Sequence, residues 1–309
     1  MRSPPFPDFV RASDVSIWWI EGGIALTRSG DHHGEPGRVV VLDEELQPRF
    51  SVDLSAPYDL VADRDRLWVS DPGVGDIVEI DRSTGEISHR FVRLSEAGPR
   101  YLTGRLCVTD GRLICAGTET EPNSRGVTDR TAAAFDLATG DLAWEFRADY
   151  DAAWPTFVAA KPVPSGMVAL LDSFGRQFTL SSAEGHRRGF HLLDGFGRDL
   201  HWGGAQLRID DVHGKGWPQW VLAGEQWYAF NAQGREVERL PASAVLAVDG
   251  RGRLLSEAGW WWEADGADEA IFVPKSRLPE GPKALGPGGH RLVVLCPDGS
   301  LREFRASDF

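Results

Sequence analysis

The feature that most constrains the fold is a repeat of short apolar runs separated by turns that contain Gly or Asp. Its clearest copy covers residues 58–92, where each run is rich in Val, Ile, Leu, Trp or Phe. Short runs bounded by turn residues predict β-strands, because a helix would need apolar positions three and four residues apart over a longer stretch. The four strands predicted in this copy are Asp59–Ala62, Leu67–Ser70, Ile77–Ile80 and Glu86–Phe91.

Seven copies of this unit fill the chain. Their first turns align at Gly23, Asp65, Gly111, Gly166, Gly216, Gly252 and Gly289, so successive copies lie 36 to 55 residues apart. This spacing brackets the roughly 40 to 50 residues of one four-stranded propeller blade. The sequence therefore predicts an all-β fold, a seven-bladed β-propeller of four-stranded blades, with six blades as the alternative.

A second turn recurs later in the unit, for example at Asp81–Gly85, Asp136–Gly140 and Ser181–Gly185. Each of these turns ends on Gly, which is expected where one residue must adopt a positive φ. The leading Asp or Ser side chain can accept hydrogen bonds from the backbone of the bend. The two turns together predict a unit of consecutive hairpins.

The two ends of the chain predict how the ring closes. After Gly289 only two strands can be assigned, so the last blade is one strand short, whereas residues 6–12 have strand length and lie beside prolines. We expect residues 6–12 to form the outermost strand of the last blade, because an outer strand tolerates proline at its free edge. Residues 1–309 would then form a single propeller domain.

The net charge limits the partners. It is −13 at pH 7, so phosphate backbones and anionic membrane surfaces would be repelled. We therefore expect neither nucleic acid nor a membrane as a partner. There is no run of about 18 apolar residues, and the prolines near the N-terminus follow no apolar signal region. The sequence predicts a soluble, acidic, cytoplasmic protein.

Three cysteines, Cys107, Cys115 and Cys296, each lie in an apolar run. Their odd number and their spacing fit neither a disulfide framework nor a zinc site. Buried free thiols are the expectation, and a bridge between Cys107 and Cys115 is the alternative.

Two segments resemble known repeat families. The segment Val69–Ile87 resembles a blade of the NHL or six-bladed-lactonase type, and Ala133–Trp144 is similar to the PQQ-like repeat. Both resemblances imply propeller architecture rather than a particular function. Quinone-binding members of the second family would be expected to carry adjacent cysteines, which are missing here, so no cofactor is predicted.

Residues 209–224 resemble the FG-GAP calcium loop. Only Asp211 matches its acidic pattern, while His213 and Lys215 stand where carboxylate ligands are needed. Calcium is therefore not predicted.

A propeller gathers certain loops at the mouth of its central channel, namely those between blades and those joining strands two and three. The two longest such loops, residues 27–38 and 117–131, map to this face, and long loops in compact folds are often functional. The repeat register places the following candidate ligand-binding residues there: His32, His33, Tyr58, Asp71, Arg100, Tyr101, Tyr150, Trp154, Arg176, His201 and Trp202.

A metal site on the same face is an alternative. Asp31, His32 and His33 are the candidate ligands, because imidazole and carboxylate groups bind zinc, iron or copper. An isolated pair of adjacent histidines is more often solvated, so the sequence predicts no metal.

The main functional hypothesis is a non-catalytic recognition propeller that binds a peptide, a protein or a small molecule. No GxSxG elbow, P-loop or dinucleotide fingerprint occurs. The acidic surface favours basic ligands. The alternative is an enzyme of the lactonase or strictosidine-synthase-like type, with Asp149, His201 and Glu225 as acid/base candidates. A third hypothesis is an assembly scaffold that uses its outer rim.

Overall fold

The computed structural model describes residues 6–10, 15–30, 35–71, 76–91, 93–95, 98–100, 102–119, 130–148, 157–163, 166–172, 176–192, 208–211, 219–223, 226–230, 236–241, 247–248, 254–255, 259–263, 270–274, 280–281, 283–285, 291–305 and 308. Almost every regular element in them is a β-strand, and α1 (Pro7–Val10) is a single turn of helix. No helix in these ranges has the length and apolar character needed to cross a bilayer.

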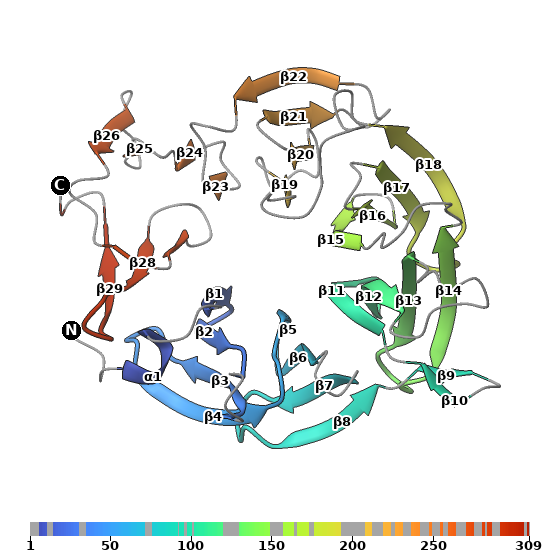
Figure 1. The fold of residues 1–309 in the computed structure, drawn as a ribbon, viewed down its shortest axis with the longest axis horizontal. Coiled ribbons are helices and arrows are strands. Elements are labelled where there is room, and N and C mark those ends of the chain that lie inside the picture. The colour runs from blue at the N-terminus through green and yellow to red at the C-terminus, as the bar shows by residue number, and fades with distance from the viewer. Residues whose placement is uncertain are drawn as a thin grey trace. The chain divides into compact units, whose positions relative to one another are not determined.

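Within the described residues, six antiparallel sheets have four strands each, and the strands pair in the order in which they follow along the chain (Figure 1). The sheets are β1–β4 (Val15–Ile20, Gly23–Arg28, Gly37–Leu42, Pro48–Leu54), β5–β8 (Asp59–Asp63, Arg66–Asp71, Asp76–Asp81, Ile87–Phe91), β11–β14 (Leu102–Thr109, Arg112–Glu119, Arg130–Asp136, Leu142–Ala148), β15–β18 (Phe157–Val163, Met167–Asp172, Arg176–Ser181, Arg187–Leu192), β19–β22 (Arg208–Asp211, Gln219–Ala223, Gln226–Phe230, Glu236–Pro241) and β23–β26 (Ala247–Val248, Leu254–Leu255, Gly259–Glu263, Ala270–Pro274). A three-stranded sheet, β27–β29 (Lys283–Leu285, Leu292–Leu295, Leu301–Phe304), follows them, and β9 (Arg93–Ser95) with β10 (Gly98–Arg100) forms a short hairpin. The predicted repeating four-stranded unit is thereby confirmed.

The two turns that define the repeat are hydrogen-bonded to each other. In three successive sheets, a backbone N–H of the second turn donates to a carbonyl oxygen of the first: Arg82 to Asp65, Leu137 to Gly111 and Ser182 to Gly166, each over 3.0 Å. The glycines that end these second turns have φ values of 77°, 80° and 70°, as their sequence pattern predicts. The recurring turn pair therefore locks the same end of each of these sheets.

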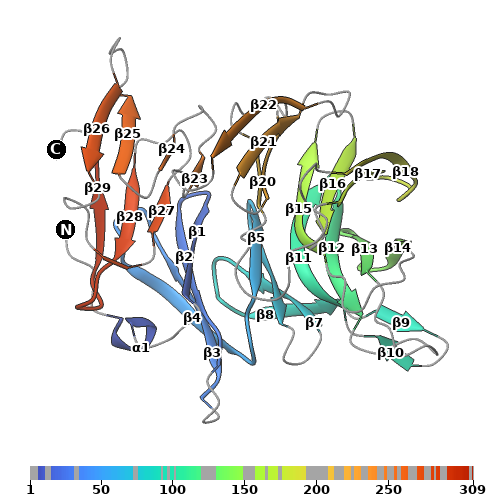
Figure 2. The ribbon, with the colours of Figure 1, turned by 45° about the horizontal axis from the view of Figure 1, so that its top comes forward.

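Contacts within the chain cluster in two compact units. The first contains Met1–Asp53, Asp210–Val221 and Glu225–Phe309, and the second contains Leu54–Ile209 and Leu222–Gly224. In the second unit, β11 packs against both β5 and β15, so the first strands of three sheets are neighbours (Figure 2). Apolar side chains fill the spaces between the sheets, as where the rings of Phe91 and Phe135 pack edge to face with their centroids 5.6 Å apart. The prediction of a single domain remains a prediction.

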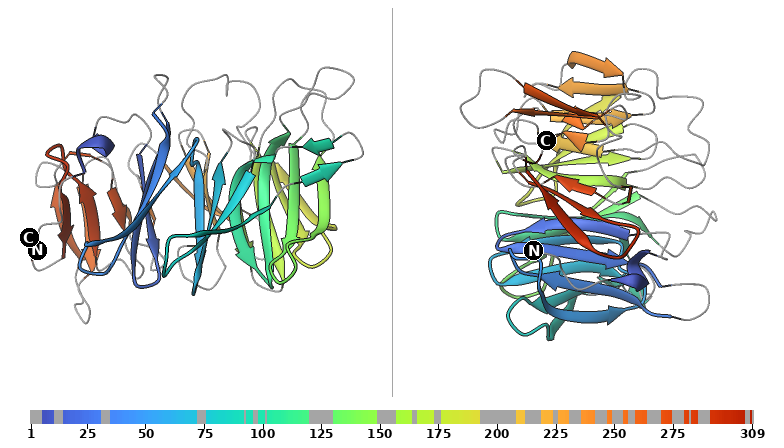
Figure 3. Two further views of the ribbon diagram at one scale, coloured as in Figure 1. Left: turned by 90° about the horizontal axis from the view of Figure 1, so that it is seen from below. Right: turned by 90° about the vertical axis from the view of Figure 1, so that its left-hand side faces the viewer.

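In the first unit, the first and the last sheets share one core. Ile24 and Leu26 of β2 pack in one apolar cluster with Val293 and Leu295 of β28, and β1 lies beside β27 (Figure 2). The first sheet, in blue, and the last sheet, in red, lie side by side in Figure 3. The two ends of the chain are therefore joined by apolar packing of sheets that are far apart in the sequence.

The expected strand over residues 6–12 is wrong for residues 7–10, which form α1, and residues 11–12 lie outside the described part. Pro7 is well suited to the first helical position, where its missing N–H costs nothing. The segment still reaches the last sheet region, because the Phe6 N–H donates to the carbonyl oxygen of Gly299 over 2.8 Å. Phe9, which is 3% exposed, enters the core shared by the first and last sheets. Among the described residues, the last sheet keeps three strands.

The prediction of buried free thiols is confirmed for all three cysteines. Cys107 lies opposite Ile114 and Cys115 lies opposite Leu106 across the β11–β12 pair. Adjacent pairs in a ladder point to opposite faces of the sheet, so the two sulfur atoms are directed away from each other and the alternative bridge is wrong. Burial also raises the pKa of the Cys115 thiol.

Candidate functional site

Four of the predicted ligand-binding residues lie in the described part of the second unit: Tyr58, Asp71, Arg100 and Arg176. The other candidates lie outside the described residues: His32, His33, Tyr101, Tyr150, Trp154, His201 and Trp202, with Asp149 and Glu225 of the enzyme alternative and Asp31 of the metal alternative.

The strand order places three of these four residues at equivalent sheet edges. In an antiparallel meander, the start of the first strand, the end of the second and the start of the third share one edge. Tyr58 directly precedes β5, Asp71 ends β6, and Arg176 begins β17 of another sheet. Arg100 lies instead at the end of the β9–β10 hairpin. The predicted register therefore brings Tyr58 and Asp71 to the same edge of one sheet.

Asp71 fixes the backbone that leads to Tyr58. Its side chain is buried, and its two carboxylate oxygens accept hydrogen bonds from the backbone N–H groups of Ser55 and Ala56 over 2.8 and 2.7 Å. The Tyr58 N–H donates to the carbonyl oxygen of Ser70 over 2.9 Å. These bonds hold the segment before β5 against the end of β6, so Asp71 positions Tyr58 through the backbone.

The Tyr58 side chain is 44% exposed and lies under a guanidinium group from the next sheet. Cζ of Arg105, in β11, is 4.5 Å from the centroid of the Tyr58 ring. This distance is typical of a cation–π contact, in which a cation is attracted to the negative face of an aromatic ring. We call this stacked pair the Tyr58–Arg105 platform.

Asp59 holds the two strands that carry the platform together. Its Oδ2 accepts a hydrogen bond from the Leu106 N–H over 2.7 Å, and its Oδ1 lies 3.7 Å from Nη1 of Arg105. The Asp59 N–H donates to the hydroxyl of Ser70 over 3.2 Å. Because the Asp59 side chain is only 7% exposed, the carboxylate joins β5 to β11 from inside the sheet packing.

Sequence reasoning missed Arg105 and Asp59 as functional residues. The sequence predicts Asp59 only as the first residue of a strand, and Arg105 is not among the predicted ligand-binding residues. The available signal is a charged residue beside apolar ones in a β-rich segment, because such a residue needs a partner if it is buried. The partner could not be named, since it comes from a different repeat.

The platform offers groups suited to binding. The aromatic ring presents an apolar face and a phenolic hydroxyl, and the guanidinium presents several hydrogen-bond donors in one plane. In the described ranges, no group of three or more His, Cys, Asp or Glu side chains is placed to hold a metal ion.

No model of a known protein family and no curated protein matches the chain. Among solved structures, the chain is similar to one described as a europium-containing methanol dehydrogenase, with a TM-score of 0.53 and 10% sequence identity. The alignment covers 92% of this chain and 62% of that chain, so this chain spans less than two thirds of the neighbour's length. At this identity the similarity concerns the fold alone. The chain has a propeller-type β fold.

Proposed function

We propose that the protein is a non-catalytic recognition module, and the observation that carries this proposal is the Tyr58–Arg105 platform. Tyrosine and arginine are enriched at binding hot spots, because both offer a large planar surface that can also form hydrogen bonds. Here the ring is exposed, while Asp59 and Asp71 fix the backbone and the cation around it. A rigid, exposed aromatic group is what a binding surface requires and what fold stability alone does not.

The finer architecture is part of the same proposal. We infer a closed propeller of seven blades, which is supported by the seven sheets of three or four strands among the described residues and by the core shared by the first and last of them. In a closed ring, the sheet edge that carries Tyr58 would join the loops of the other blades at one shared opening. The remaining predicted ligand-binding residues would then lie around the same opening.

The ligand we favour is a basic peptide segment. The net charge of −13 attracts cationic partners at long range. The same charge disfavours nucleic acid and anionic membranes. A cytoplasmic location is supported by three buried cysteines that are all free, which suits a reducing compartment.

Selection from a displayed library of random peptides tests the proposal. We expect the enriched peptides to be rich in Lys or Arg and to bind more weakly as salt concentration rises. Tyr58→Ala should lower their affinity about tenfold or more, because truncating a hot-spot aromatic costs about 2 kcal/mol. Leu142→Ala is the matched control, since Leu142 is an apolar residue of the same unit with a similar exposure of 40%.

The control variant decides the interpretation. If both variants bind the selected peptides as the wild type does, the platform is not the recognition site. Turnover of a lactone or ester panel that is lost in His201→Ala and Asp149→Asn would instead establish the enzyme alternative.

A further inference from the structure

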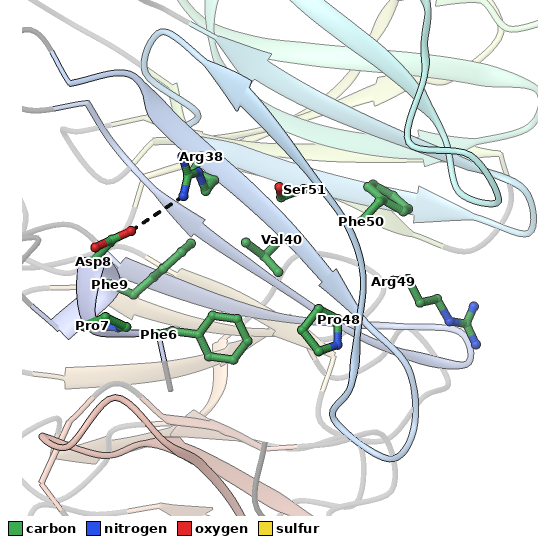
Figure 4. Close-up of a pocket in the computed structure, with 10 residues that line it drawn as sticks. All are labelled: Phe6, Pro7, Asp8, Phe9, Arg38, Val40, Pro48, Arg49, Phe50 and Ser51. Carbon is green, nitrogen blue, oxygen red and sulfur yellow. Dashed lines mark ion pairs between the residues drawn. The ribbon is translucent and has the colours of Figure 1, made fainter. Parts of the chain in front are cut away.

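The first unit contains a pocket of about 370 Å³ between α1 and the strands β3 and β4 (Figure 4). Its wall combines apolar side chains with polar ones, among them the two arginines Arg38 and Arg49. The apolar residues used below are Phe6, Phe9, Val40 and Pro48. None of them belongs to the Tyr58–Arg105 platform.

The strand period explains why these side chains gather on one face. Side chains two residues apart on a strand point to the same side, so Arg38 and Val40 of β3 share a face. Asp53 of β4 bonds to Arg38 and therefore lies on this face, together with Ser51 of the same strand. Helix α1 covers one side of this face and directs Phe9 into the core. The rings of Phe6 and Phe9 pack edge to face, with centroids 6.1 Å apart and planes at 83°. The aromatic part of the wall is therefore held rigidly.

Three carboxylates attract the Arg38 guanidinium, those of Asp53, Asp8 and Glu35, and the first two lie within ion-pair distance of it. Its Nε donates a hydrogen bond of 2.8 Å to Oδ1 of Asp53, and this bond raises the pKa of Arg38. Its Nη1 lies 3.6 Å from Oδ2 of Asp8, which is an ion pair too long for a hydrogen bond (Figure 4). Among the described residues, the two terminal nitrogens of Arg38 therefore have no hydrogen-bond acceptor. They form the edge of a guanidinium that normally binds a carboxylate in bidentate fashion.

We propose that this pocket binds a small aromatic carboxylate. The aromatic ring of the ligand packs against Phe6, Val40 and Pro48, and its carboxylate takes the terminal nitrogens of Arg38 in place of Asp8. Ligand pockets in proteins span roughly 300 to 1,000 Å³, and this pocket lies at the lower end, so it suits a ligand of one ring with a short acidic chain. The exposed position of Asp8, whose side chain is 59% exposed, allows it to be displaced without burying an unpaired charge.

The first test uses 3-phenylpropanoate as the probe and 3-phenylpropan-1-ol as its uncharged counterpart. A ligand of this size is expected to bind with a Kd near the millimolar range, which titration calorimetry or ligand-observed NMR can measure. The alcohol should bind about tenfold or more weakly, because it lacks the charge-assisted hydrogen bonds to Arg38. Equal binding of the two probes, or no binding of either at about 20 mM, would overturn the proposal.

The second test uses the protein's own competing carboxylate. Asp8→Asn removes the anion beside Nη1 of Arg38, so 3-phenylpropanoate should bind several-fold more tightly, while binding of the alcohol stays the same. Glu86→Gln is the matched control, because it makes the same change of net charge at an exposed residue of the other unit. If Asp8→Asn and Glu86→Gln change the affinity equally, the effect is long-range charge and the proposed site is wrong.

Two further variants separate binding from folding. Arg38→Gln should abolish the difference between the two probes, and its thermal unfolding curve shows whether the first unit is intact. Tyr58→Ala should leave binding of 3-phenylpropanoate unchanged, so failure of the recognition proposal and failure of this one are distinguishable. Loss of the probe signal in Tyr58→Ala with an unchanged melt would place the probe elsewhere and refute the pocket.

Discussion

Replacing Asp59 tests whether a carboxylate joins two neighbouring sheets. In Asp59→Ala, the Leu106 N–H loses its acceptor in a position where the Leu106 residue is only 6% exposed, and the Arg105 guanidinium loses a partner 3.7 Å away. Asp59→Asn keeps an oxygen that can accept from the Leu106 N–H and removes only the charge. The two variants therefore separate the hydrogen bond from the ion pair.

The magnitudes follow from these contacts. A hydrogen bond to a charged group contributes about 1.5 to 3 kcal/mol, and a buried donor left without a partner costs a similar amount. Both figures describe the loss of the same bond between the Leu106 N–H and Asp59, so it is counted once. The ion pair with Arg105, whose side chain is 32% exposed, adds at most about 1 kcal/mol. We expect Asp59→Ala to lower the free energy of unfolding by about 2 to 4 kcal/mol and Asp59→Asn by about 1 to 2 kcal/mol.

Urea unfolding monitored by circular dichroism measures these losses. Scaled by the average unfolding entropy per residue, they correspond to a decrease in melting temperature of about 3 to 6 °C for Asp59→Ala. Asp63→Ala is the control, because Asp63 ends the same strand and is exposed, and its carboxylate bonds only locally, to the Arg64 N–H. Its effect should stay within about 0.5 kcal/mol. Equal stability of the Asp59→Ala and Asp63→Ala proteins would refute the reasoning.

Three other predictions concern the N-terminal segment, a turn and the thiols. Phe9→Ala should lower the unfolding free energy by about 3 to 5 kcal/mol, because it leaves a cavity in the core. Gly299→Ala should lower it by at least about 1 kcal/mol, because Gly299 has a φ of +80° and an added Cβ would lie 3.1 Å from the Phe6 nitrogen. Urea titration measures both changes, and an unchanged midpoint would show that the N-terminal segment is not docked on the last sheet. Hydrogen bonds, first of all from the Ser83 hydroxyl, lower the pKa of Asp81 from 3.8 to about 2. The ionised Asp81 side chain therefore stabilises the folded protein above pH 3.8, and this contribution is lost as the pH falls through 2. Ser83→Ala should raise the pKa of Asp81, which an NMR titration measures. Native protein should react slowly with thiol reagents, because Cys115 is buried and its pKa is raised, whereas denatured protein should show three reactive thiols; rapid modification of the native protein would contradict the packing.

The repeat was predictable from sequence because it depends on local patterns. Strand length, turn glycines and apolar composition all act within a few residues, and the predicted first turns at Asp65 and Gly111 lie between the first two strands of their sheets. Residues 7–10 were assigned wrongly because strand length and flanking prolines describe an edge strand and a proline-initiated helical turn equally well. The burial of the Phe9 side chain favours the helical turn over the strand. Phe9 is buried against residues of the last sheet, which are distant in sequence, so a local pattern does not reveal it.

The platform escaped prediction for a related reason. Tyr58 was identified from its place in the repeat, but its stacking partner Arg105 is set by how two different repeats pack, and no single-repeat pattern contains that information. The sequence predicts Asp71 as a loop carboxylate that binds a ligand, whereas in the structure it ends β6 and its two oxygens accept hydrogen bonds from the backbone before β5. Sequence register predicts which residues share an edge, whereas the contacts of each side chain depend on the neighbouring sheet.

Neighbouring sheets of the second unit are joined by side-chain hydrogen bonds as well as by apolar packing. Asp59 bonds from β5 to the Leu106 N–H in β11, and the Ser182 hydroxyl, after β17, donates over 2.5 Å to Asp110 in the turn between β11 and β12. Trp144 of β14 adds a bond from its indole N–H to the Ser182 carbonyl oxygen over 2.8 Å. Such bonds fix the angle between sheets, which apolar contacts alone leave adjustable. The Tyr58 ring is therefore presented from a rigid base, and under the proposed recognition function a ligand that bound to the ring would cause little loss of entropy in the protein.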